Sequence, residues 1–108
     1  MTTVIASFNV SDYDRWRAGY AHAVGDPKLL SWRIWRGQDD PNHVVIEETF
    51  DSADYARQVF TSETTRNAMT NDGVNLATLT LEYLDEASGI RPGMSRGNAG
   101  RLRERALA

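Results

Sequence analysis

The stretch TTVIASFNV, Thr2–Val10, is followed directly by SDYDRWRAGYAHAV, and this change of pattern decides the fold. In the first part, apolar side chains occupy every second position, which is the period of a β-strand. The dipeptide Ser11-Asp12 then supplies residue types that cap the start of a helix. Side chains that belong on one face of a helix follow at Tyr13, Trp16, Tyr20 and Val24. The sequence therefore predicts a strand over 2–10 and an amphipathic helix that runs to about Ala23.

Two further strands are predicted after the helix. Gly25-Asp26-Pro27 ends the helix, because proline lacks the amide donor that a helix needs. Residues 29–37 and 43–50 have strand-like patterns, and the turn residues between them indicate a hairpin. Trp32 and Trp35 fall on opposite faces of the first of these strands, since side chains alternate along a strand.

The second half of the chain predicts a pair of helices and a last strand. Helix-start patterns occur at 51–54 and again at 61–63, and Gly73 is a plausible helix terminator. The segment 75–84 reads as a strand with an apolar face formed by Ala77, Leu79, Leu81 and Tyr83. The resulting order, strand, helix, strand, strand, helix pair, strand, predicts an α+β, ferredoxin-like βαββαβ domain with a four-stranded antiparallel sheet.

The charge is divided unevenly along the chain. Residues 1–87, the predicted domain, carry a net charge of −7, and residues 88–108 carry +4, so that the whole chain has −3. We therefore expect an acidic domain followed by a basic C-terminal tail. Nucleic acid is not an expected partner, because the domain repels phosphate and the tail has no aromatic residue on which a base would stack.

The sequence also bears on location and assembly. It has no cysteine, no secretory leader pattern at its start and no apolar run of the roughly 20 residues that span a bilayer, so we expect a cytoplasmic protein away from membranes.

Helices on one side of the sheet leave its other side uncovered, and both faces of the first three strands carry apolar residues. A second copy of the chain is the simplest cover, so we expect a homodimer.

Three segments resemble a known family. They are Val4–Trp16, which ends in Asp12-Tyr13-Asp14-Arg15-Trp16; the strand Trp32–Gly37 with Asp39-Asp40-Pro41-Asn42 after it; and the helix from Ser62-Glu63 to Met69. Over about residues 2–86 the chain resembles the dimeric α+β barrel superfamily, and within it small antibiotic-biosynthesis-monooxygenase-like and cyclase-like proteins. The resemblance implies a homodimer joined through its sheets, with a pocket between sheet and helices. Members include cofactor-free oxygenases of aromatic polyketides, haem-degrading enzymes, isomerases and cyclases. The fold alone therefore does not identify the activity.

Two residues are candidates for catalysis. In proteins that the chain resembles, an asparagine on the first strand positions a phenol or an oxygen species, and Asn9 occupies such a place; it would alternatively satisfy the turn into the helix. Related proteins also carry a histidine near the end of the first helix, as His22 does here. An ideal helix turns His22 toward solvent. His43 is expected at an exposed edge.

Aromatic and apolar side chains are the candidate ligand contacts. Trp16, Tyr20 and Tyr55 lie where a helix turns toward the sheet, as core residues or as the wall of a pocket. The full set of expected substrate contacts is Trp16, Tyr20, Trp32, Trp35, Tyr55, Phe60 and Met69. Glu47 and Glu48 must point to opposite faces of their strand, and whichever is buried would be a candidate base with a raised pKa. A salt bridge to Arg33 or Arg36 is the alternative for that carboxylate.

No cofactor is expected. The segment 52–72 contains no histidine to ligate haem iron, the two histidines of the chain show no metal-ligand spacing, and no glycine-rich phosphate loop follows a strand. The sequence predicts a small-molecule enzyme or binding protein that acts on a planar aromatic or polyketide-like ligand. The alternative is a non-catalytic dimeric interaction module. An open cavity with polar walls favours the first, and a cavity filled by Trp16, Tyr20 and Phe60 favours the second.

Overall fold

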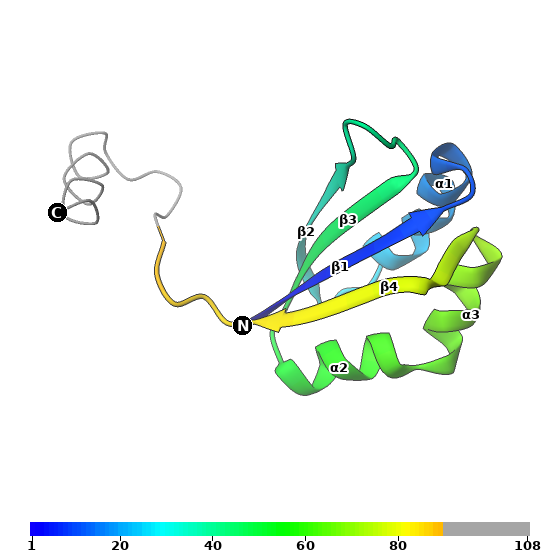
Figure 1. Ribbon diagram of the computed structural model, residues 1–108. Coiled ribbons are helices and arrows are strands. Elements are labelled where there is room, and N and C mark those ends of the chain that lie inside the picture. Colours follow the sequence, from blue (N-terminus) through cyan, green and yellow to red (C-terminus); the bar gives the residue numbers. More distant parts are fainter. Residues whose placement is uncertain (90–108) are drawn as a thin grey trace, which may run out of the picture.

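The computed structural model describes residues 1–89 and shows a four-stranded antiparallel sheet with its helices packed on one face (Figure 1). Along the chain the elements are β1 (Thr2–Val10), α1 (Tyr13–Val24), β2 (Leu29–Arg36), β3 (His43–Phe50), α2 (Ala53–Thr61), α3 (Glu63–Asn71) and β4 (Val74–Leu84). The strands lie in the order β2-β3-β1-β4, and all neighbours are antiparallel. This confirms the predicted ferredoxin-like α+β fold. Residues 90–108, which include most of the predicted basic tail, lie outside the described part of the chain.

The helices begin and end where the local sequence predicts. The side chain of Asp12 accepts a hydrogen bond of 3.2 Å from the amide of Arg15, and Ser52 accepts one of 3.2 Å from the amide of Tyr55. Both satisfy donors that the first turn of a helix leaves free. Gly73 has a φ of +90° just after α3, in the region that glycine adopts without strain.

Alternation along β1 and β3 builds the core. Val4, Ala6 and Phe8 of β1 are fully or almost fully buried, and so are Val44 and Phe50 of β3. The helices complete this core with four buried side chains, those of Trp16, Tyr20, Ala56 and Phe60.

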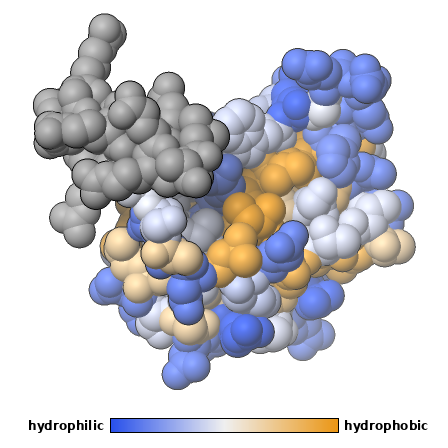
Figure 2. All heavy atoms as spheres, turned by 60° about the vertical axis from the view of Figure 1, so that its left-hand side comes forward, coloured by the Kyte–Doolittle hydropathy of each residue, from blue (hydrophilic) through white to orange (hydrophobic). Residues whose placement is uncertain are grey.

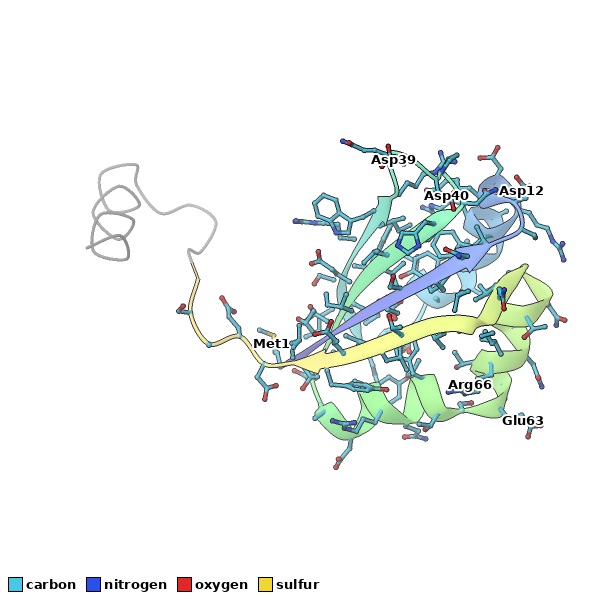
Figure 3. All side chains as sticks on the ribbon, viewed as in Figure 1. Met1, Asp12, Asp39, Asp40, Glu63 and Arg66 are labelled. Carbon is cyan, nitrogen blue, oxygen red and sulfur yellow. The ribbon has the colours of Figure 1, made fainter. Side chains whose placement is uncertain are left out.

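The turns at one end of the sheet are tied together by Asn42. Its backbone oxygen accepts a 2.8 Å hydrogen bond from the amide of Val10, and its side-chain oxygen accepts one of 3.2 Å from the amide of Tyr13. Figure 3 shows Asp12 and Asp40 at this same end, away from Met1. The β2–β3 turn therefore holds the start of α1 in place.

The predicted alternation of β4 is wrong in its first half. The pairing with β1 shifts register between Ser7, opposite Thr80, and Asn9, opposite Asn75, so that β4 bulges. Leu76 packs against the core in place of Ala77, which is exposed. The cause is local hydrogen bonding by polar side chains of the bulge. Asn75 Oδ1 accepts from the amide of Ala77 at 3.1 Å. Such bonds compete with regular strand pairing.

The outward face of the sheet is mixed in character. Ile5, Val45 and Trp35 lie on it, and Trp35 is 50% exposed, but the residues beside them along the strands include Ser7 and Glu47. Figure 2, which brings the left side of Figure 1 forward, shows hydrophobic side chains at the centre of this view within a border of hydrophilic ones. The expectation of apolar residues on both faces is thus met only in part. The homodimer stays a prediction.

Within residues 1–89, no helix has both the length and the apolar character needed to cross a membrane.

Candidate functional site

A cavity of about 350 Å³ lies between the sheet and the three helices. This volume falls within the range of about 300–1,000 Å³ that is usual for small-molecule sites. β1, β3, α1, α2 and α3 all contribute side chains to its wall. Its apolar wall includes Phe8, Ile46, Phe50, Val59, Phe60 and Met69. Its polar wall includes Tyr20, His22, Asp26, Glu48, Tyr55 and Asp72.

A tyrosine and a glutamate are paired inside this wall. The hydroxyl of Tyr20 in α1 donates a 2.5 Å hydrogen bond to Oε2 of Glu48 in β3. Glu48 is only 3% exposed and Tyr20 only 7%. The second carboxylate oxygen of Glu48 is left as an acceptor. A buried carboxylate in a cavity wall, held by one neutral donor, can accept a proton from a bound molecule.

Burial shifts the protonation of both partners. Removal from water raises the pKa of Glu48, although the hydrogen bond from Tyr20 opposes this rise and the charge of Asp26 adds to it. The pKa of the Tyr20 hydroxyl is raised as well, by burial first and then by the adjacent Glu48 charge. Tyr20 therefore keeps its proton at neutral pH, and Glu48 is a stronger base than a glutamate on the surface.

A second pair of the same kind stands in the same cavity. The hydroxyl of Tyr55 in α2 donates a 2.5 Å hydrogen bond to Oδ2 of Asp26, in the loop between α1 and β2. This bond raises the pKa of Tyr55. The Nζ atom of Lys28 lies 4.5 Å from the centre of the Tyr55 ring. The pair ties the α1–β2 loop to α2 and adds a second carboxylate to the wall.

A third carboxylate, that of Asp72, lies against Gly19 of α1. A Cβ atom built on Gly19 would lie 2.3 Å from Cγ of Asp72, so only glycine lets this side chain pack so closely on the helix. Both residues line the cavity.

Most of the predicted ligand contacts meet in this cavity. Trp16, Tyr20, Tyr55, Phe60 and Met69 all line it. Trp16 and Tyr20 stack with ring centroids 5.0 Å apart and still leave the cavity open. Trp32 is not in the wall; its ring packs edge to face on Tyr20 at 5.9 Å.

The two residues predicted to be catalytic, His22 and Asn9, do not lie in the centre of the cavity wall. His22 lines the cavity but is exposed, as the helical spacing predicts, so it stands at the rim. Asn9 belongs to the outward-facing side of β1 and is not part of the cavity wall. Trp35 is on that same outward side, where its indole Nε1 donates a 2.7 Å hydrogen bond to Glu47. Catalytic roles for Asn9 and His22 stay predictions.

Asn9 belongs instead to a row of hydrogen-bonded polar side chains on the outward face of the sheet. Its Oδ1 lies 2.8 Å from Nδ1 of His43, and Nε2 of the same ring lies 3.4 Å from Oγ of Ser7. The expectation that His43 is an exposed edge residue is wrong, because β3 is an inner strand and the imidazole is half-buried.

The structure decides between the two adjacent glutamates. Glu48 is the buried one, with the raised pKa that the sequence predicts for a buried carboxylate at this position. Its partner is the Tyr20 hydroxyl rather than Arg33 or Arg36. Arg33 is directly opposite Glu47, on the outward face, and Arg36 donates to the backbone oxygen of Pro41. The signal in the sequence is strand parity, since Glu48 shares the face of Val44, Ile46 and Phe50 and Glu47 does not.

Among residues 1–89, no group of three or more histidine, cysteine, aspartate or glutamate side chains is arranged to hold a metal ion.

Comparison with solved structures identifies proteins of the same fold. A crystal structure of an antibiotic biosynthesis monooxygenase superposes with a TM-score of 0.64 and 18% identity, over 82% of this chain and 100% of the other. SnoaB, a cofactor-independent oxygenase from Streptomyces nogalater, gives 0.59 and 18%, over 84% and 96%. A conserved protein from Methanosarcina mazei Go1 gives 0.58 at 8% identity, over 79% and 91%. No family model and no curated protein sequence matches the chain. The fold of the antibiotic biosynthesis monooxygenase structures, expected from the resemblance, is therefore confirmed.

Proposed function

We propose that this protein binds a small planar aromatic molecule in the cavity between sheet and helices and oxidises it without a metal or nucleotide cofactor. The observation that carries the proposal is the buried Glu48, which faces this cavity and is held by Tyr20 at 2.5 Å. Some structures of the same fold are named as monooxygenases, and SnoaB is named as a cofactor-independent oxygenase. These names support the proposal by analogy of fold.

Glu48 has the properties of the base that this reaction needs. It would take a proton from an acidic CH₂ group or a phenol of the ligand, and the electron-rich anion that remains would pass an electron to O₂. The overall change is CH₂ + O₂ → C=O + H₂O. One oxygen atom enters the product, the other leaves as water, and all four electrons come from the substrate. The raised pKa of Glu48 favours the first proton transfer.

The open space in the cavity does not favour the alternative function, a non-catalytic interaction module. Trp16, Tyr20 and Phe60 leave a space of about 350 Å³, and ionisable groups line it. A cavity that served only to complete a core would be filled by these aromatic rings, because protein interiors are close-packed.

Oxygen uptake with anthrone, a planar three-ring ketone with an acidic CH₂ group, tests this proposal. We expect the protein to accelerate O₂ consumption and formation of the quinone above the uncatalysed rate. Glu48→Gln keeps the shape and an acceptor for Tyr20 but removes the base, so kcat/KM should fall by about 100-fold or more.

Glu47→Gln is the matched control, because it makes the same change one residue away on the opposite face of the sheet. We expect it to keep the rate. Equal rates for the Glu48→Gln protein and the unchanged protein would overturn the role of Glu48. Binding of anthrone without O₂ consumption would overturn the oxygenase reaction and favour a binding module.

A further inference from the structure

The polar wall of the cavity is dominated by carboxylates. Asp26, Glu48 and Asp72 line it, and they come from three separate parts of the chain. Among the lining residues in the described part of the chain, none is lysine or arginine. His22, at the rim, is the only one that becomes cationic on protonation. The other polar side chains of the wall, those of Tyr20, Tyr55, Thr64 and Thr65, carry neutral hydroxyl groups, so the ionised groups that a bound molecule meets are carboxylates.

The hydroxyl protons of Tyr20 and Tyr55 already take part in hydrogen bonds within the wall. Tyr20 donates to Glu48 and Tyr55 donates to Asp26, each at 2.5 Å. A tyrosine hydroxyl has a single proton, so what each oxygen can still offer a ligand is a lone pair. Both tyrosine–carboxylate pairs thus act as acceptors toward the cavity. They would bind a ligand that donates hydrogen bonds.

The two cations nearest the cavity, Arg17 and Lys28, lie beside aromatic rings. The guanidinium carbon of Arg17 lies 5.3 Å from the centre of the Trp32 ring and 6.0 Å from that of Tyr20, and Nζ of Lys28 lies 4.5 Å from the centre of the Tyr55 ring. Neither residue lines the cavity. Both cations therefore lie behind or beside wall residues, and neither supplies a positive group to the lining itself.

The distribution of charge in the proposed reaction also favours a ligand that is uncharged when it binds. When Glu48 takes a proton, one negative charge moves from Glu48 to the ligand, and the total charge in the cavity is unchanged. A ligand that brings its own carboxylate adds a further charge beside Asp26 and Asp72. Like charges at short range in a partly dry site repel strongly.

We propose, resting on the function proposed above, that the cavity selects uncharged planar ligands with hydrogen-bond donors at two separated positions and rejects ligands that carry a carboxylate. The two tyrosine–carboxylate pairs accept hydrogen bonds from donor groups of the ligand. The three carboxylates together repel anions. The ligand class is accordingly a neutral polyhydroxylated aromatic.

Three naphthalenes of similar size test this selection. The first, 2,6-dihydroxynaphthalene, is neutral with two donors; 2,6-dimethoxynaphthalene is neutral with none; and 6-hydroxy-2-naphthoic acid is an anion at neutral pH. Isothermal titration calorimetry at pH 7 gives the three dissociation constants. We expect the diol to bind at least about tenfold more tightly than either of the others, since the loss of paired donors or the gain of a like charge each exceeds that factor in a buried site.

The site of binding is read from amide chemical shifts. Gly19 and Ala68 line the cavity, so their amide signals should move with the diol, whereas the indole signal of Trp35 on the opposite face should not. Movement of the Trp35 signal alone would place binding on the outward face and overturn the inference.

Charge variants separate selection from binding. In Glu48→Gln the anion should gain affinity several-fold relative to the diol, while in the control Glu47→Gln the ratio should stay within about twofold of the unchanged protein. Equal affinity for all three compounds would overturn the selection and leave the proposed function intact. No binding of any of them would overturn both.

Discussion

Tyr20 and Glu48, which are 28 positions apart in the chain, meet in the cavity wall through a hydrogen bond of 2.5 Å from the tyrosine hydroxyl to the glutamate Oε2. The bond joins α1 to the inner strand β3 across the core. Both side chains are buried, so the bond does two things at once. It satisfies a carboxylate that has been removed from water, and it fixes that carboxylate in the cavity wall.

Tyr20→Phe should destabilise the fold. The substitution keeps the ring that stacks on Trp16 but leaves the buried Glu48 carboxylate without its donor. The free energy of unfolding at pH 7 should fall by about 1–3 kcal/mol, measured by urea denaturation. Tyr55→Phe removes a bond of the same length from Asp26, but Tyr55 and Asp26 are both half-buried, so water can replace the lost bond. Its loss should be clearly smaller, and equal losses would contradict the view that burial of Glu48 sets the cost.

The stability of the protein should depend on pH through Glu48. Burial raises the pKa of this group in the folded state, so the folded protein holds the proton to higher pH than the unfolded chain. The free energy of unfolding then falls as pH rises from the ordinary glutamate pKa of about 4.3 through the raised pKa, and it levels off above. Glu48→Gln should abolish this fall, and Glu47→Gln should retain it. Urea denaturation between pH 4 and 8 compares the three proteins, and parallel curves for all of them would contradict the assignment.

Gly73→Ala should be costly for a conformational reason. Gly73 has a φ of +90°, and a Cβ atom there would lie 2.4 Å from Oγ of Ser11. We expect a loss of about 1–3 kcal/mol in thermal or urea unfolding, because a side chain is strained at this backbone angle. Gly25→Ala is the control, since Gly25 has a φ of −76° and its nearest neighbour, the oxygen of His22, is 3.4 Å from the added atom. Its effect on stability should be small.

Local patterns predicted the fold well because local physics determines most of it. The alternation of Thr2–Val10 persists in a strand whose residues are alternately buried and half-buried, and the capping positions Asp12 and Ser52 act as expected. β4 differs because Asn75 and Thr78 hydrogen-bond within the strand and force a bulge. That effect depends on side-chain geometry rather than on the period of apolar residues.

The site was less predictable, since it depends on which faces meet in space. Helical spacing correctly turned Trp16 and Tyr20 inward and His22 outward, and strand alternation correctly separated Trp32 from Trp35. The inward position of Glu48 follows from the strand parity that it shares with Ile46, but its partner Tyr20 became known only from the packing of α1 on β3. The pairing of Tyr55 with Asp26 joins a helix to a distant loop, which no local pattern encodes.

The predicted homodimer can be tested on the outward face of the sheet. Val45 is half-buried on this face, between Ser7 of β1 and Trp35 of β2. If two copies pack sheet to sheet, Val45→Lys places a charge in the dry centre of the interface, where burial of an unpaired charge is strongly unfavourable. The unchanged protein should then have the mass of a dimer in native mass spectrometry, and the Val45→Lys protein that of a monomer. Asn67→Lys adds the same charge to an exposed position of α3 and should leave the dimer intact. A monomeric mass for the unchanged protein would show that its mixed outward face is stable in water without a partner.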